Sequence, residues 1–183
     1  NTKENRQKAS RLQTVGITKQ MSRLRKYGCI LAHQKALEKA VRGKMNNILI
    51  LEEDATLSRA LPSPPKYPCY MGGWIVPKNI SETGTHKVTI PSLSTGLQSI
   101  DYETFQIIMS HSYFLPSYTD AKDIVTTIKT ADKIRNYDIF LARERFMHHF
   151  YYPPCFVQGK HVSDIDGKVN KNDAHTLFYG LKE

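Results

Sequence analysis

The sequence predicts an α/β protein in which a central, mostly parallel sheet is flanked by helices. Two observations predict this class. Apolar residues at helical spacing alternate along the chain with short apolar runs, and the run at 48–51 is continuous, as in a buried parallel strand. At 183 residues the chain is long enough to bury a sizeable core, and we expect residues 1–183 to form a single domain.

The first part of the chain is predicted to contain two helices followed by a strand. Residues 2–15 are rich in helix formers and stop at Gly16. Residues 21–41 carry apolar side chains at roughly helical spacing and stop at Gly43. The apolar run at 48–51 then forms the strand.

The rest of the chain is predicted to alternate between loops, strands and helices. Prolines make residues 62–65 a loop, and the polar stretch at 78–104, rich in Gly, Ser and Thr, predicts a second loop. The other expected elements are strands at 70–74, 112–115 and 155–158 and helices at 118–129 and 132–148.

The net charge of +9 indicates an anionic partner. Much of the excess lies in the first quarter of the chain, where basic side chains are spread along helical segments without regularly interleaved aromatic residues. This pattern is more typical of a solvated helix face than of a nucleic-acid groove, and phosphorylated small molecules fit the charge equally well. We therefore expect no nucleic-acid partner.

The cysteines bear on the cellular compartment. Cys29, Cys69 and Cys155 are odd in number and far apart, which argues against a disulfide framework and against a zinc knuckle. Buried free thiols in a reducing compartment are the expected state. Since no signal peptide opens the printed chain and no apolar stretch has bilayer length, we expect a cytoplasmic protein without a transmembrane segment.

Three consecutive carboxylates, Glu52, Glu53 and Asp54, follow the strand at 48–51. In open α/β sheets ligands bind beyond the carboxyl ends of the strands. Adjacent acids repel one another unless something positive lies among them, and a hard divalent cation that prefers oxygen ligands is the usual remedy. A solvated loop, or a cap for a following helix, explains these acids equally well.

Five short segments stand in an order that one enzyme family shares. Residues 28–33 (GCILAH) match a Gly-Cys-x-x-Ser-His segment, and residues 48–55 (ILILEEDA) match a strand that ends in Leu-Glu-Asp-Asp. Three later segments correspond to the patterns Ala-Tyr-Leu-Ile, Val-Asp-x-x-Leu and Pro-x-Leu-x-Gln with Ser-x-Ile, at 112–115, 137–141 and 154–165. Together they resemble glycosyltransferase family 25, which includes lipopolysaccharide sugar transferases and collagen galactosyltransferases.

The chain also departs from this family. Ala32 stands where the family usually has Ser, and Glu53 stands where it usually has Asp. The family's first strand would precede Asn1, and the stretch between residues 17 and 28 is shorter than the resemblance leads us to expect. We therefore expect that an N-terminal strand and internal segments of the natural protein are missing from the printed chain.

The resemblance implies a GT-A-like, Rossmann-related fold that binds a nucleotide sugar. It implies transfer of a sugar, with inversion, from a UDP-linked donor to a glycan, lipid-linked or protein acceptor. It also implies a Mn²⁺ or Mg²⁺ ion held by Asp54, with Glu52 as a second ligand or a donor contact. Glu53 faces the opposite way if the strand pleat persists, so it is the weakest of the three candidate donor contacts.

Other site roles come from the same resemblance. Asp138 matches the family's acid and is the candidate general base, although it could equally bond its own helix or Arg135. Asp164 is the alternative base. The resemblance also offers His33, Arg6 and Gln158 as donor contacts, although His33 could be a buried structural residue and Arg6 a surface charge. Independently of the resemblance, Gly73 could let the backbone approach a sugar closely, and a simple turn is its alternative.

Two other functional classes fit the sequence. A metal-dependent phosphoryl-transfer enzyme or nuclease would use the acidic cluster and the basic charge together, but it usually needs more converging carboxylates. A catalytically inactive, basic binding module is the other alternative, in which the change at Glu53 or a lost segment has removed activity.

Overall fold

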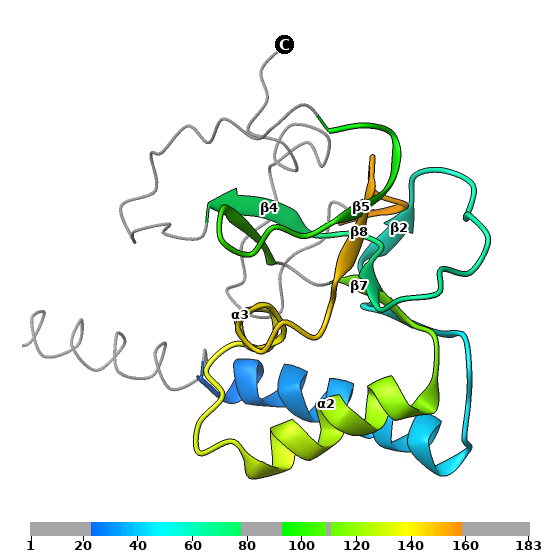
Figure 1. Ribbon diagram of the computed structural model, residues 1–183. Helices are drawn as coiled ribbons and strands as arrows, with labels where there is room; N and C mark the ends of the chain where they lie inside the picture. Colours follow the sequence, from blue (N-terminus) through cyan, green and yellow to red (C-terminus); the bar gives the residue numbers. More distant parts are fainter. Residues whose placement is uncertain (1–22, 78–92, 109–110, 159–183) are drawn as a thin grey trace, which may run out of the picture.

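The computed structural model describes residues 23–77, 93–108 and 111–158. In these ranges the helices form one layer and the strands lie against it, as Figure 1 shows. The protein therefore has a mixed α/β fold, in agreement with the class predicted from the sequence.

The first helix covers residues 23–42 of the described chain. One face of it is buried, and because these positions are three or four residues apart they follow the helical period, at Ile30, His33, Leu37 and Ala40. The helix ends where the sequence predicts, since Gly43 donates its backbone N–H to the carbonyl of Lys39 at 3.0 Å. The helix predicted at 2–15 lies outside the described residues.

Helix α2 (Tyr118–Thr130) begins at a capping box. The hydroxyl of Ser117 accepts the backbone N–H of Asp120, whose carboxylate accepts the N–H of Ser117 at 3.0 Å. Lys129 Nζ lies 2.8 Å from Glu38 Oε1, which joins α2 to the first helix beside it (Figure 1). The buried face of α2 consists of the inward residues that the sequence indicates, Ala121, Ile124, Val125 and Ile128.

Helix α3 (Tyr137–Arg143) is much shorter than the helix predicted over 132–148. The chain turns after it, with Arg145 in the left-handed region at φ 55°, and then forms strand β8 (His149–Tyr152). The predicted helix is too long because the chain leaves α3 to join the sheet. The backbone N–H of His148 donates to the carbonyl of Pro68 at 3.1 Å, a long-range contact that local spacing does not reveal.

The five-stranded sheet has the order β1-β7-β3-β8-β5. β1 (Ile48–Leu51) and β7 (Ser112–Leu115) occupy the predicted positions, whereas β5 (Gly96–Ser99) lies inside the predicted loop at 78–104. Of the four pairings only β3 (Cys69–Tyr70) with β8 is parallel. The mostly parallel sheet is thus a wrong prediction for the described residues. Parallel neighbours need a long crossover, usually a helix, and the described chain has no helix between β1 and β7.

Two strand pairs lie outside this sheet. β2 (Ala55–Leu57) pairs antiparallel with β9 (Phe156–Gln158), and the strand predicted at 155–158 is thereby confirmed. β4 (Trp74–Pro77) pairs antiparallel with β6 (Phe105–Ile108). These pairs connect segments about 30 to 100 residues apart in sequence, so the sequence alone does not reveal them.

A glycine bend divides the single strand predicted at 70–74. β3 ends at Tyr70 and β4 begins at Trp74. A Cβ atom on Gly72 would lie 2.5 Å from both the hydroxyl of Ser112 and the carbonyl oxygen of Phe156. Only glycine allows the three chain segments to come this close.

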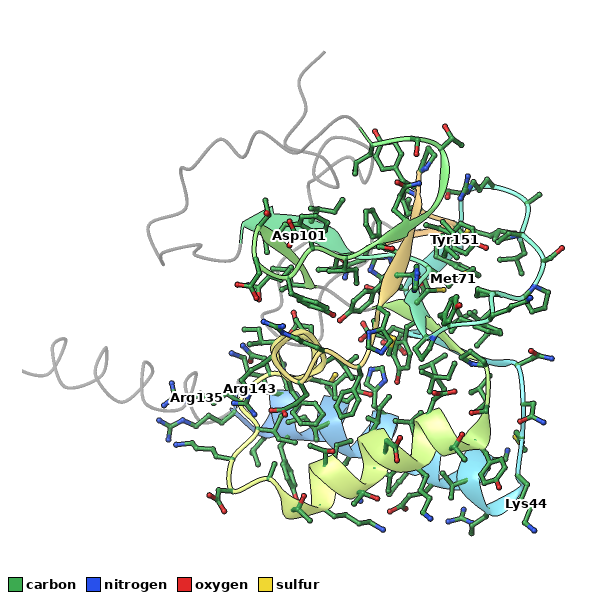
Figure 2. The ribbon with its side chains drawn as sticks, viewed as in Figure 1. Lys44, Met71, Asp101, Arg135, Arg143 and Tyr151 are labelled. Carbon is green, nitrogen blue, oxygen red and sulfur yellow. The ribbon has the colours of Figure 1, made fainter. Side chains whose placement is uncertain are left out.

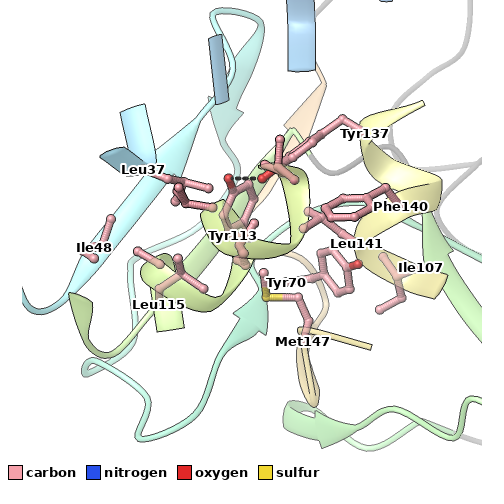
Figure 3. Close-up of a cluster of buried hydrophobic side chains, with 14 of the residues drawn as sticks. Leu37, Ile48, Tyr70, Ile107, Tyr113, Leu115, Tyr137, Phe140, Leu141 and Met147 are labelled. Carbon is pink, nitrogen blue, oxygen red and sulfur yellow. Dashed lines mark hydrogen bonds between the residues drawn. The ribbon is translucent and has the colours of Figure 1, made fainter. Parts of the chain in front are cut away.

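The five-stranded sheet buries both of its faces. Successive strand residues point to opposite faces, so Tyr113 and Leu115 join the large helix-side cluster whereas Phe114 joins a smaller cluster on the other face. Figure 3 shows the helix-side cluster, where Leu37 of the first helix lies near Tyr113 and Leu115. Met71 and Tyr151 belong to the smaller cluster and lie together in Figure 2.

Candidate functional site

The acidic segment forms a tight turn between β1 and β2. Glu52 donates its backbone N–H to the carbonyl of His111 at 2.9 Å, and its own carbonyl accepts the N–H of Ala55 at 3.1 Å. Glu52 and Asp54 are half-buried, whereas Glu53 is exposed. The turn therefore directs the first and third carboxylates toward the protein and the middle one toward solvent, so Glu53 faces away from its two neighbours, as the sequence predicts.

The side chain of Glu52 is held by a buried histidine. His33 Nε2 lies 3.1 Å from Glu52 Oε1, and His33 is only 6% exposed. The imidazole ring stacks on the ring of Tyr137, with the centroids 4.0 Å apart. His33, which the sequence singles out as a donor contact or a buried structural residue, is therefore both buried and in direct contact with the acidic turn.

Two tyrosine hydroxyls continue this network into the core. His33 Nδ1 lies 3.1 Å from the hydroxyl of Tyr113, which lies 2.8 Å from the hydroxyl of Tyr137 (Figure 3). Burial raises the pKa of both phenols well above the ordinary value, so they stay protonated and can donate. In a neutral imidazole the pattern assigns the proton to Nε2, which donates to Glu52, while Nδ1 accepts from Tyr113.

Cys29 lies one helical turn before His33 and faces the same site. Its sulfur, a ring nitrogen of His33 and a carboxylate oxygen of Glu52 all lie within 4.8 Å of one another. Burial, together with the negative charges of Glu52 and Asp138, raises the pKa of the Cys29 thiol to about 12. The charge of Asp138 therefore reaches this cluster from α3.

Asp138 itself lies in the first turn of α3 and is half-buried. Its Oδ1 accepts the backbone N–H of Ile139 at 2.8 Å, so it bonds its own helix, as the structural alternative expects. That contact leaves its role as a general base untested. The alternative base, Asp164, lies outside the described residues.

Asp54 has a partner of its own on β9. Gln158 Nε2 donates to Asp54 Oδ2 at 2.6 Å, across the β2–β9 pair that places Ala55 opposite Gln158. The other oxygen, Oδ1, is buried and has no hydrogen-bond partner among the described residues. The structure thus brings together two residues, 104 positions apart, that the sequence assigns to the metal and donor site.

The unpartnered oxygen of Asp54 is a test of whether a metal ion fits. A buried carboxylate oxygen without a donor is destabilising, and a cation would satisfy it. Mg²⁺ is usually bound through one or two carboxylates plus substrate phosphates, and Mn²⁺ likewise favours carboxylate ligands. Asp54, with Glu52 two residues before it, fits that donor set. Asp54 is not part of the group formed by Cys29, His33 and Glu52.

Of the remaining predicted donor contacts, the structure describes Gly73 but not Arg6. Gly73 is buried at the entry to β4 with φ 142°, a backbone conformation that favours glycine, so a structural role accounts for it. Arg6 lies outside the described residues. The sequence interpretation missed Tyr113 and Tyr137 as site residues, and it gave Cys29 only a core role although the Cys29–His33 spacing was a usable signal.

Comparisons with known proteins found no counterpart. No family model, curated protein or solved structure matches this chain. In the part of the chain that the structure describes, no helix combines the length and apolar character that crossing a membrane requires.

Proposed function

We propose that this protein is a glycosyltransferase that moves a sugar from a nucleotide-sugar donor, UDP-linked, to an acceptor hydroxyl on a glycan, lipid-linked or protein substrate. One observation carries the proposal. The turn after β1 holds Glu52 against His33 at 3.1 Å and Asp54 against Gln158 at 2.6 Å, with one buried Asp54 oxygen left without a partner. These residues belong to three of the five segments that resemble glycosyltransferase family 25.

The acidic turn is suited to the leaving group of such a reaction. Loss of a nucleoside diphosphate develops negative charge, which a bound divalent cation neutralises. Asp54 would hold Mn²⁺ or Mg²⁺ through its unpartnered oxygen, and Glu52 would serve as a second ligand or a donor contact. His33 fixes the orientation of the Glu52 carboxylate, and Gln158 fixes that of Asp54.

The acceptor hydroxyl must lose a proton as it attacks the anomeric carbon. Asp138 is the proposed general base, because it matches the family's acid in the Val-Asp-x-x-Leu segment and follows Tyr137, whose ring stacks on His33 at 4.0 Å. The proposal includes a nucleotide-sugar-binding fold of the GT-A type, although the described sheet is mixed and not mostly parallel.

A melting experiment on the full chain tests the proposal. UDP together with Mn²⁺ should raise the Tm, because a ligand present at 100 times its Kd stabilises the folded state by about 2.7 kcal/mol, which is several degrees for a protein of this size. The variant Asp54→Asn should lose the shift. Glu53→Gln is the matched control, since it removes an equal charge from the exposed middle of the same turn and should keep the shift.

The same experiment separates the alternative functions. A shift with nucleic acid that disappears steeply with added salt would favour a nuclease or a basic binding module. The glycosyltransferase proposal would be rejected if UDP and Mn²⁺ together left the Tm unchanged and the Asp54→Asn variant behaved like the parent.

A further inference from the structure

Three metal-ligating side chains of different chemistry converge between the first helix and the end of β1. Cys29 and His33 are four residues apart, so they lie on one face of the helix. Together with Glu52 they bring a sulfur, a nitrogen and an oxygen within 4.8 Å of one another. Around tetrahedral Zn²⁺ such donor atoms lie about 3.3 to 3.8 Å apart, from the usual bond lengths. To enclose an ion, His33 Nε2 and Glu52 Oε1, now 3.1 Å apart, would separate slightly and the Cys29 sulfur would move closer to them.

The surroundings of His33 are those of a metal-binding histidine. Such a ligand binds through one ring nitrogen and directs the other toward a hydrogen-bond partner that fixes the ring. His33 Nε2 faces Glu52, and its Nδ1 lies 3.1 Å from the hydroxyl of Tyr113. Stacking on Tyr137 at 4.0 Å holds the ring plane as well.

The tyrosine pair can adapt to either state of the histidine. Without a metal, Tyr113 donates to Nδ1 and Nε2–H donates to Glu52. With a metal on Nε2, the proton moves to Nδ1 and is donated to the Tyr113 oxygen, and Tyr113 then donates to Tyr137 at 2.8 Å. Binding would release one proton in total, that of the Cys29 thiol.

Charge and access also favour a cation. The group contains one carboxylate, that of Glu52, and a divalent cation would balance the negative charge that this carboxylate and a metal-bound thiolate bring together. Cys29 is half-buried and the Glu52 side chain is 34% exposed, so the group can be reached from solvent. A set of one sulfur, one nitrogen and one oxygen suits Zn²⁺ or Co²⁺, whereas Mg²⁺ and Mn²⁺ favour oxygen ligands.

We propose that Cys29, His33 and Glu52 form a site for a zinc-like divalent ion, distinct from the Mn²⁺ or Mg²⁺ position at Asp54. Three protein ligands leave a fourth position open. This site does not depend on the proposed glycosyltransferase activity. If both sites exist, they share Glu52, so a zinc-like ion would draw Glu52 away from the sugar donor and would inhibit transfer.

Cobalt titration of the full reduced chain tests the site. Co²⁺ bound to a thiolate gives a sulfur-to-cobalt charge-transfer absorption, which we expect to appear and to be displaced by Zn²⁺ but not by Mn²⁺. Cys29→Ser should abolish the band. Tyr113→Phe should keep the band but weaken Co²⁺ affinity about 10- to 100-fold, because it removes the outer partner of His33.

Matched variants separate this site from other binding. Cys155→Ser removes another free thiol and should leave the band unchanged. Asp54→Asn should also leave the band unchanged while it removes the UDP and Mn²⁺ melting shift, so failure of one proposal is distinguishable from failure of the other. Absence of the band in the parent chain, or its persistence in Cys29→Ser with far-UV circular dichroism intact, would overturn the zinc-like site.

Discussion

The two inward carboxylates of one turn are held in different ways. Glu52 is fixed by a buried histidine whose other nitrogen is bonded to a tyrosine in the core. Asp54 is fixed by a single amide from β9 and keeps one buried oxygen without a partner among the described residues. The difference indicates that the framework of His33 and Tyr113 fixes the orientation of Glu52, whereas Asp54 keeps one oxygen available to a ligand.

The strongest way to test this division is to neutralise Asp54. If its free oxygen holds the cation that stabilises the leaving diphosphate, Asp54→Asn should lower sugar transfer about 10²- to 10³-fold, as loss of one electrostatic contact to a transition state does. The stability of the unliganded protein should change little, because the amide retains a bond to Gln158 and loses a buried charge. Initial rates and urea unfolding measure the two effects, and equal transfer by both proteins would reject the assignment.

If His33 and Tyr113 form the framework that holds Glu52, breaking their hydrogen bond should lower the free energy of unfolding. Tyr113→Phe leaves the imidazole nitrogen and the Tyr137 hydroxyl without their shared partner, which should lower the free energy of unfolding by about 1 to 3 kcal/mol. Urea unfolding measures it. Tyr27→Phe is the control, because that tyrosine is 58% exposed on the helix that carries His33 and its loss of a hydroxyl should change stability by less than about 0.5 kcal/mol. A Tyr113→Phe variant as stable as this control would contradict the framework role.

Alkaline pH should lower the stability of the folded protein through the buried Cys29 thiol, by less than Tyr113→Phe does. The folded-state pKa of Cys29 is raised from 9.0 to about 12 by burial and by Glu52 and Asp138. The folded state therefore binds this proton more tightly, so its contribution to stability is complete below pH 9 and is lost as pH rises toward 12. Tm measured from pH 7 to 11 should fall less steeply in Cys29→Ser than in the parent. Parallel curves would show that Cys29 is not buried as described.

The smallest effect is expected at the middle of the turn. Glu53 is exposed between the two inward carboxylates, so Glu53→Gln should change stability by less than about 0.5 kcal/mol and transfer by less than about twofold. Rates and unfolding curves collected beside those of Asp54→Asn measure both quantities. A large loss of transfer in Glu53→Gln would mean that the roles within the turn are assigned to the wrong carboxylate.

The sequence predicted best those elements whose pattern is local. β1, β7 and α2 were found because each has a continuous apolar run or a clear helical face, and Gly43 ends its helix as expected. The extent of α3 and the presence of β8 could not be found locally, because Phe150 is buried by its neighbours in the sheet. The antiparallel direction of most strand pairs was not predicted either, because each strand pairs with a segment far away in the sequence.

The candidate site shows the same limit. The acids were visible as a cluster at a strand end, and His33 was visible through a resemblance. Their partners were not, because the bond from His33 to Tyr113 joins residues 80 positions apart and the bond from Gln158 to Asp54 joins residues 104 apart. A hydroxyl on a buried strand carries no local mark of such a contact.

The bend at Gly72 packs against both strands that support the acidic turn, so the positions of Glu52 and Asp54 depend on the same contact. Because Gly72 has no side chain, Ser112 and the carbonyl of Phe156 can lie close to it. Ser112 precedes Tyr113 in β7, and Phe156 lies two residues before Gln158 in β9. A single added methyl group would therefore displace the strand that supports His33 and the strand that supports Asp54 at once. The distance between the Glu52 and Asp54 carboxylates therefore depends on the absence of a Cβ atom at Gly72.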